Sequence, residues 1–182
     1  MYKWQVKKNL NHNYILNVNK KSYSCQVGKN GIIKAKNKKE GDFFTPAGLW
    51  RLKKLYYRKN RLFFSLDGIY DKIILEEISE NCAWCDDENS AFYNKKIKII
   101  EGNAKFKSNY ENLWREDHAY DLFFELGFND APVIKGKGSA IFLHCSFEDL
   151  RPTAGCVAVS KETFKYILKE LRPNTFLDIS DN

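Results

Sequence analysis

The chain has 182 residues, 43% of them hydrophobic and 15% aromatic, which predicts a single folded domain over residues 1–182. Its net charge of +7 would suit a nucleic-acid partner, but the basic residues are scattered, and the one dense run, at 34–39, is typical of a solvated loop. We therefore expect no nucleic-acid partner. No window approaches the run of about 20 apolar residues that a spanning helix needs, so we also expect no membrane span.

The cysteines and the N-terminal segment lead to two further expectations. Five cysteines are an odd number without a regular framework, so a disulfide-built domain is not expected at this length. Residues 1–20 contain no apolar core of the length that a secretory signal peptide requires. We therefore expect unpaired thiols and no signal peptide in this chain.

The first half of the chain has the alternation of apolar and polar residues that is typical of short strands. Apolar and polar residues alternate over 2–36, between clusters of turn-forming residues, which predicts short antiparallel strands. Segments 49–57 and 62–66 are predicted to form a strand pair, and 68–78 a further strand.

Residues 79–96 interrupt this alternation and are predicted to form a long loop. Trp84 and the paired carboxylates that follow it have two interpretations of equal weight: the wall of a binding groove, or an Asp-capped turn with a packed Trp. Cys82 and Cys85 have the spacing of half a zinc site or a redox pair. Because no second pair accompanies them, we expect two ordinary thiols.

The last part of the chain contains the clearest helix. Segment 97–100 is a short apolar piece, 108–118 a short helix or an ordered loop, and 120–128 a strand. Ser160 is the expected N-cap of a helix that ends before Pro173, and four residues form its apolar face, Phe164, Ile167, Leu168 and Leu171. With a last strand at 176–179, the chain is predicted to be mainly β with one or two short helices.

Stretch 140–160 contains the two residues best placed for nucleophilic catalysis. An apolar run ends on His144, Pro152 breaks the connection that follows, and a second strand begins at Cys156. Neighbouring strands would bring the imidazole within hydrogen-bond reach of the thiol and raise its thiolate fraction. Gly155 would let a substrate carbonyl approach the backbone N–H groups. Taken alone, Cys156 is more typical of a small buried core residue, and His144 together with the motif stretches at 45–48 and 136–144 favours the nucleophile.

Several motifs of the chain resemble the YkuD-type L,D-transpeptidase catalytic domain and occur in the same order as in that family. Gly136-x-Gly-Ser139-x-Ile-Phe-x-His144, followed by Thr153-x-Gly-Cys156-x-Ala-x-Ser160, is similar to one branch of that family. Further similar stretches are Gly41-Asp42, Thr45-Pro-Ala-Gly48, Trp84-Cys-Asp-Asp87, Asn94, Tyr120-Asp-Leu122, Asn129 and Pro132. The resemblance covers about residues 30–180.

This resemblance implies a β-sandwich or barrel of mixed sheets with a C-terminal amphipathic helix, and a cysteine acyltransferase acting on peptidoglycan stem peptides. Cys156 would be the nucleophile, His144 its base and Gly155 part of the oxyanion site, with no metal or other cofactor. The substrate-binding residues would be Trp84, Asp86, Asp87, Trp114, Arg115, Tyr120, Ser139, Arg151 and Thr153, with His118 in a supporting role. The family further implies inhibition by carbapenem-type β-lactams and a location in the cell envelope or periplasm.

The chain departs from the better-known pattern of this family at two positions. Ala154 stands where a second His is usual, and Ala158 where Arg or Asn is usual, so a group that helps to hold the donor peptide is missing. Arg151, Arg115 or a lysine would replace it, because a guanidinium pairs bidentately with a carboxylate. Three functions therefore remain open: an L,D-transpeptidase, an L,D-carboxypeptidase or amidase-like hydrolase with the same pair, and a non-catalytic wall-binding module.

Overall fold

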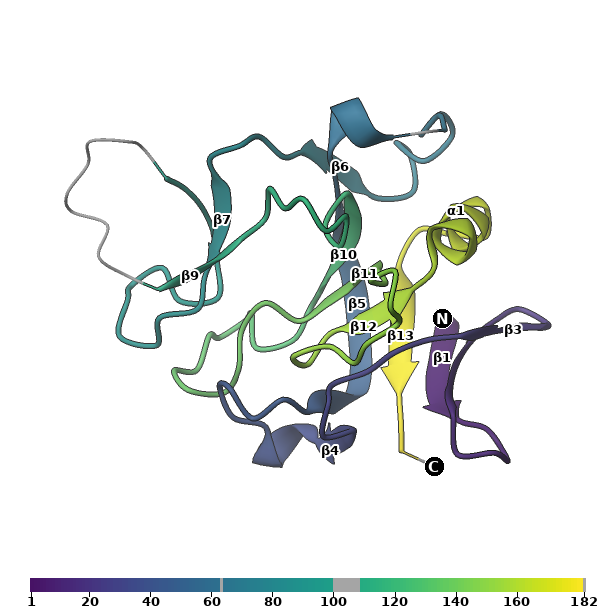
Figure 1. The fold of residues 1–182 in the computed structure, drawn as a ribbon, viewed down its shortest axis with the longest axis horizontal. Helices are drawn as coiled ribbons and strands as arrows, with labels where there is room; N and C mark the ends of the chain where they lie inside the picture. Colours follow the sequence, from purple (N-terminus) through teal and green to yellow (C-terminus); the bar gives the residue numbers. More distant parts are fainter. Residues whose placement is uncertain (63, 100–108, 182) are drawn as a thin grey trace.

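The computed structural model describes residues 1–62, 64–99 and 109–181, and their architecture is mainly β, as predicted (Figure 1). The strands of the large sheet are β1 Tyr2–Lys8, β2 Tyr14–Val18, β3 Lys21–Ser24, β4 Ile32–Lys34, β5 Thr45–Tyr57, β6 Ile74–Glu77, β10 Leu122–Leu126, β11 Phe142–Cys145, β12 Val157–Val159 and β13 Thr175–Ile179. They run in the order β12-β11-β10-β5-β13-β1-β2-β3, with β4 and β6 also paired to β5. A small sheet has the order β8-β7-β9, with β7 at Cys82–Cys85, β8 at Lys96–Lys98 and β9 at Tyr110–Asn112.

The large sheet is nearly closed into a barrel. Just after β3, Gln26 makes an antiparallel bridge to Ala158 of β12, with backbone hydrogen bonds of 2.8 and 2.9 Å. Gly28 makes a second, parallel bridge to Thr153. These two bridges hold the segment after β3 against the connection that carries Cys156, so the contacts that close the sheet also build the site.

The main core lies between this sheet and helix α1 (Lys161–Lys169), which has the predicted N-cap: Ser160 Oγ accepts the N–H of Thr163 at 3.1 Å. Phe164 on the buried face of α1 stacks on Phe124 of β10, with ring centroids 5.3 Å apart. Two 3-10 helices, η1 (Ala35–Asn37) and η2 (Lys59–Arg61), flank β5. Among the described residues, no helix is long and apolar enough to cross a membrane.

A second cluster, which is aromatic, lies on the face of β10 and β11 that points away from the main core. Side chains alternate along a strand, so Phe123 and Phe142 point away from the main core while their neighbours point into it. Phe142 packs against Phe123 and Trp84 with ring centroids 4.8 and 5.0 Å away. Cys156 belongs to this aromatic cluster, which therefore forms the packing around the nucleophile.

Four predicted elements differ from the structure. Segment 68–78, predicted as one strand, is a strand only at β6 (Ile74–Glu77), and turns and a bend occupy 68–73. Residues 82–85, expected inside a loop, form the fully buried strand β7, because a short apolar run without alternation gives no period to detect. The partners of β5 are β4, β6, β10 and β13 rather than segment 62–66, of which residue 63 lies outside the described part. Segment 108–118 contains strand β9 rather than a helix. Residues 100 and 108, at the ends of two predicted segments, also lie outside the description.

Candidate active site

Strand β11 places His144 and Cys145 on opposite faces of the sheet. Cys145 is in the main core, as predicted, and its Sγ lies 3.6 Å from the Leu122 carbonyl oxygen. His144 is on the aromatic side and only 2% exposed. Its ring is edge-on to Tyr120 and Phe147, with centroids 5.3 and 6.1 Å away, so packing restricts its orientation.

The tautomer of His144 follows from one hydrogen bond. Its Nδ1 lies 2.7 Å from the carbonyl oxygen of Cys145. Because a carbonyl oxygen only accepts, Nδ1 carries the hydrogen and Nε2 keeps the lone pair. Burial lowers the pKa of His144 from 6.5 to about 4, although this hydrogen bond acts in the opposite direction. At neutral pH the imidazole is therefore uncharged, with Nε2 able to take a proton.

Cys156 immediately precedes β12, which pairs parallel with β11. Its thiol donates to the carbonyl oxygen of Ala140 at 3.1 Å and accepts the N–H of Phe142 at 3.4 Å. Burial raises the pKa of the thiol to about 12. The sequence predicts an imidazole within hydrogen-bond reach and a larger thiolate fraction, but the hydrogen bonds of the thiol among the described residues go to Ala140 and Phe142. Burial disfavours the charged forms of thiol and imidazole alike, so both groups are neutral at rest.

Two threonine hydroxyls fix the backbone of Cys156. Thr153 Oγ1 donates to the Cys156 carbonyl oxygen at 2.7 Å and accepts the N–H of Gly155 at 3.1 Å. Thr45 Oγ1 also donates to this carbonyl, at 3.2 Å, and accepts the N–H of Gly28 at 2.8 Å. The Gly155 N–H expected at the oxyanion site is thus already bonded to a hydroxyl.

Gly155 is required at its position by both conformation and space. Its φ of +148° is unfavourable for residues with a side chain, and a Cβ there would lie 3.0 Å from the carbonyl oxygen of Phe44. The close approach of the segment around Phe44 to the Cys156 connection therefore depends on this glycine.

A cavity of about 390 Å³ opens over this pair. It brings together nine of the residues predicted from the sequence: Cys156, His144, Gly155, Asp86, Arg115, Tyr120, Ser139, Arg151 and Thr153. It is also lined by Lys38, which was predicted to lie in a solvated loop but is buried and paired with Asp42. Residues that sequence analysis did not single out complete the lining, among them Glu40, Phe43, Glu111 and Phe147. These come from connecting segments far apart in the chain, where no local motif marks them.

Trp84 and Asp87 lie outside the cavity. Trp84 is buried in the aromatic cluster, and its Nε1 donates to Asn94 Oδ1 at 2.9 Å. Asp87 accepts the N–H of Asn89 at 2.9 Å and so caps a turn. Their placement matches the second sequence interpretation, a packed Trp beside an Asp-capped turn.

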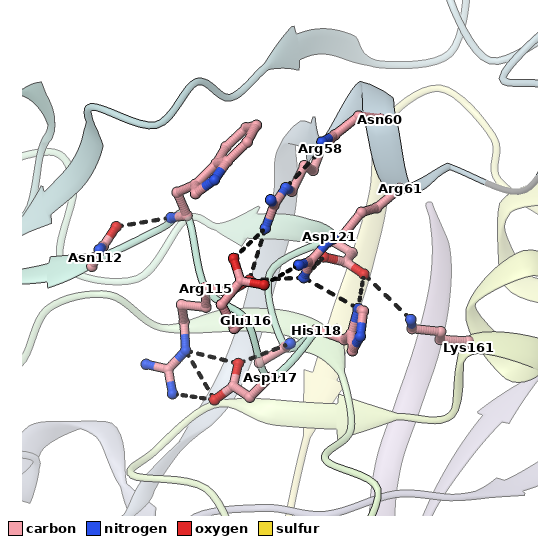
Figure 2. A network of polar contacts seen from close by, with 12 residues as sticks. Arg58, Asn60, Arg61, Asn112, Arg115, Glu116, Asp117, His118, Asp121 and Lys161 are labelled. Atoms are coloured by element: carbon pink, nitrogen blue, oxygen red, sulfur yellow. Dashed lines mark hydrogen bonds and ion pairs between the residues drawn. The ribbon is translucent and has the colours of Figure 1, made fainter.

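Trp114 and His118 also lie outside the cavity, in the segment that joins β9 to β10. The guanidinium of Arg58 lies 3.7 Å from the centre of the Trp114 ring. Nδ1 of His118 lies 2.7 Å from Oδ2 of the buried Asp121, which is also an ion-pair partner of Lys161 at 3.3 Å (Figure 2). The contacts of both residues stabilise the segment between β9 and β10.

The same segment places Arg115 at the cavity, and two further arginines hydrogen-bond to its backbone (Figure 2). Arg58 and Arg61 both donate to the carbonyl oxygen of Arg115, at 2.8 and 2.9 Å. The guanidinium of Arg115 is itself bonded to Asp117 at 3.0 Å and to Glu111 at 2.7 Å. Arg115 is therefore paired with two carboxylates, Asp117 of its own segment and Glu111 of β9.

Arg151 has looser contacts than Arg115. It is 54% exposed, lies 4.0 Å from the centre of the Phe147 ring, and reaches Asp117 only at 3.9 Å. Of the two departures from the family pattern, Ala154 lines the cavity, whereas Ala158 is fully buried and bridged to Gln26. Arg151 is thus the arginine of this cavity better able to take a new anionic partner.

A thiol and a neutral imidazole line one cavity of a mainly-β fold, an arrangement that cysteine-dependent enzymes share. The family model of the YkuD L,D-transpeptidase catalytic domain matches residues 6–179, and the chain belongs to this family. The match begins inside β1, earlier than the resemblance of about 30–180, and β1 pairs with β13 in the large sheet. A comparison with curated proteins finds no significant match.

Proposed function

We propose that the protein is an L,D-transpeptidase, which joins peptidoglycan stem peptides through a thioester on Cys156 and acts in the cell envelope. The observation that carries this proposal is the cavity that contains both the Cys156 thiol and the neutral His144 ring, whose Nδ1–H is held by a backbone carbonyl. Membership of the family supports catalysis on peptidoglycan.

In the proposed first step, the Cys156 thiol turns from the Ala140 carbonyl and its proton passes to His144 Nε2. Sulfur attacks the carbonyl that follows the L-centre of a stem tetrapeptide, and the backbone N–H of Cys156 stabilises the oxyanion. The C–N bond then breaks, and His144 returns the proton to the departing amine of D-Ala. A thioester and free D-Ala result.

In the second step, an amine of a neighbouring stem attacks the thioester and gives its proton to His144. The C–S bond breaks, the proton returns to sulfur, and a cross-link and the free thiol of Cys156 are formed. Arg151 is the proposed anchor for a substrate carboxylate, because its ion-pair contacts with described residues, Asp117 and Asp149, are long.

The test is the intact mass of the protein after incubation with a carbapenem or with a stem tetrapeptide. We expect one adduct on the wild type and on Cys145→Ala, which alters a core thiol next to His144, and no adduct on Cys156→Ala. With an acceptor amine present, a cross-linked product supports the transpeptidase, and a tripeptide acid instead favours the hydrolase. A folded wild-type protein that forms no adduct with either compound contradicts both activities and favours a non-catalytic wall-binding module.

A further inference from the structure

Part of the cavity wall carries carboxylates that the proposed chemistry does not use. Glu40, Asp86 and Glu111 line the same cavity as Cys156 and His144. Glu111 is paired with Arg115 at 2.7 Å. Within the described ranges, neither Glu40 nor Asp86 has an ion-pair partner of opposite charge.

The carboxylate of Asp86 is incompletely satisfied. Its Oδ1 is buried and has no hydrogen-bond partner among the described residues. Burial raises the pKa of Asp86, and the nearby carboxylates of Glu40, Glu111 and Asp87 raise it further. A buried acceptor without a donor is unfavourable, so this wall favours a group that donates hydrogen bonds and carries positive charge.

Ser139 is an independent indication of a ligand at the same wall. Ser139 is 6% exposed and lines the cavity, and its Oγ, although it lies near the Tyr93 hydroxyl, has no described residue in full hydrogen-bond geometry. The neighbouring Gly138 donates its N–H to the Tyr93 hydroxyl at 3.0 Å, and that hydroxyl donates to Glu40. Tyr93 therefore ties Glu40 to the turn that carries Ser139.

Two of the three cations that line the cavity are bonded elsewhere, and the third, Arg151, is loosely paired and is the proposed anchor for a substrate carboxylate. Lys38 is buried, with its Nζ 2.6 Å from Asp42 and 2.7 Å from the carbonyl oxygen of Lys39. Arg115 is paired with Asp117 and Glu111, and Arg151 reaches toward Asp117 and Asp149. The positive group that matches Glu40 and Asp86 therefore comes from the ligand.

We propose that Glu40, Asp86 and Ser139 form a subsite for a primary ammonium group on a side chain of the bound peptide. An ammonium carries three donors, which two carboxylates and one hydroxyl accept. The identity of the peptide as a stem with a diamino acid rests on the proposed function, whereas the ammonium subsite itself does not. The subsite selects donors by the charge of one side chain and takes no part in the acyl transfer.

The experiment measures binding to folded Cys156→Ala protein, which removes acyl transfer. Two stem tetrapeptides are compared by calorimetry, one with lysine at its third position and one with Nε-acetyl-lysine there. We expect the lysine peptide to bind about tenfold more tightly, since a charge-assisted contact of this kind is lost on acetylation. In the Asp86→Asn background the ratio should fall to about threefold or less. Asp87→Asn is the matched control, because its side chain lies outside the cavity and still accepts the Asn89 N–H.

Three results overturn the subsite: equal affinity for the two peptides, no binding of the lysine peptide at millimolar concentration, or an unchanged ratio in Asp86→Asn with native circular dichroism. The transpeptidase proposal fails separately. If the wild type forms no thioester while Cys156→Ala still prefers the lysine peptide and Asp86→Asn abolishes that preference, the ammonium subsite stands and only the reaction is wrong.

Discussion

The hydroxyl of Thr45 lies 3.2 Å from the carbonyl oxygen of Cys156, although 111 positions separate the two residues in the chain. The same hydroxyl accepts the N–H of Gly28, whose bridge to Thr153 helps to close the sheet. Thr45 begins β5, the strand that pairs with four others. The backbone of the nucleophile is thus bonded directly to the central strand of the fold.

We expect Thr45→Val to lower both stability and acylation. The substitution keeps the shape of the side chain but leaves the buried Gly28 N–H without its acceptor, a loss of about 1–3 kcal/mol in the free energy of unfolding. It also frees the Cys156 carbonyl from one of its two hydroxyl donors, which should slow acylation by a carbapenem. Urea unfolding and the rate of adduct formation by mass measure the two effects.

Thr175→Val is the control for this prediction. Thr175 is as deeply buried as Thr45, and among the described residues its hydroxyl is bonded only to the backbone of Arg172, away from the cavity. It should lose comparable stability and keep the wild-type acylation rate at a temperature where both variants are folded. Equal slowing in both variants would show that Thr45 acts through stability alone.

Gly155→Ala should abolish acylation and destabilise the fold by about 1–3 kcal/mol, because the backbone conformation is unfavourable for alanine and the Cβ would press on the Phe44 carbonyl. Gly127→Ala is the comparison, since its Cβ would meet the Lys53 side chain only at 3.5 Å. Thermal unfolding and adduct formation of the two variants decide the point. A fully active Gly155→Ala protein would contradict the role assigned to this close approach.

The decline of the acylation rate at acidic pH should reflect the low pKa of His144. Only the neutral ring accepts a proton, and burial keeps it neutral down to about pH 4. The second-order rate constant for carbapenem acylation should therefore stay level from pH 7 to pH 5 and decline with an apparent pKa near 4. A decline centred near pH 6.5 would mean that the ring is solvated in the working enzyme.

Stability should depend on pH through the same residue. The pKa of His144 is lowered in the folded state, from 6.5 to about 4, so the unfolded chain takes up a proton first as the pH falls. The contribution of the neutral ring is fully present above pH 6.5 and is lost between pH 6.5 and 4. Urea unfolding across this window should show a shallower pH dependence for His144→Gln than for the wild type. The exposed His12→Gln should keep the wild-type slope.

Arg151→Gln should weaken binding of the donor tetrapeptide without changing the rate of the chemical step. If Arg151 anchors a substrate carboxylate, the tetrapeptide concentration that gives half-maximal acylation should rise about tenfold, while the rate at saturation stays within about twofold. Arg172→Gln is the control, because this arginine lies over the Tyr2 ring, away from the cavity. An unchanged half-maximal concentration in Arg151→Gln would assign the carboxylate to another group.

Much of the fold is encoded in local patterns. The Ser160 cap and the apolar face of α1 repeat at helical spacing, and His144 ends an apolar run that is indeed strand β11. Such patterns are readable because each depends on residues within one turn or one strand. Strand β7 was not predicted because it lacks such a pattern: all four of its residues are buried, so apolar and polar residues do not alternate along it.

The sequence by itself determined the family, the helix and the presence of His144 and Cys156 in one motif. The tertiary structure decided how that motif is used. Closure of the sheet brings Thr45 to the Cys156 carbonyl, and burial makes the thiol and imidazole neutral. Connections distant in the chain meet to place Glu40 and Asp86 in the same cavity. Long-range contacts and desolvation arise only when segments far apart in the chain pack together, so no local pattern reveals them.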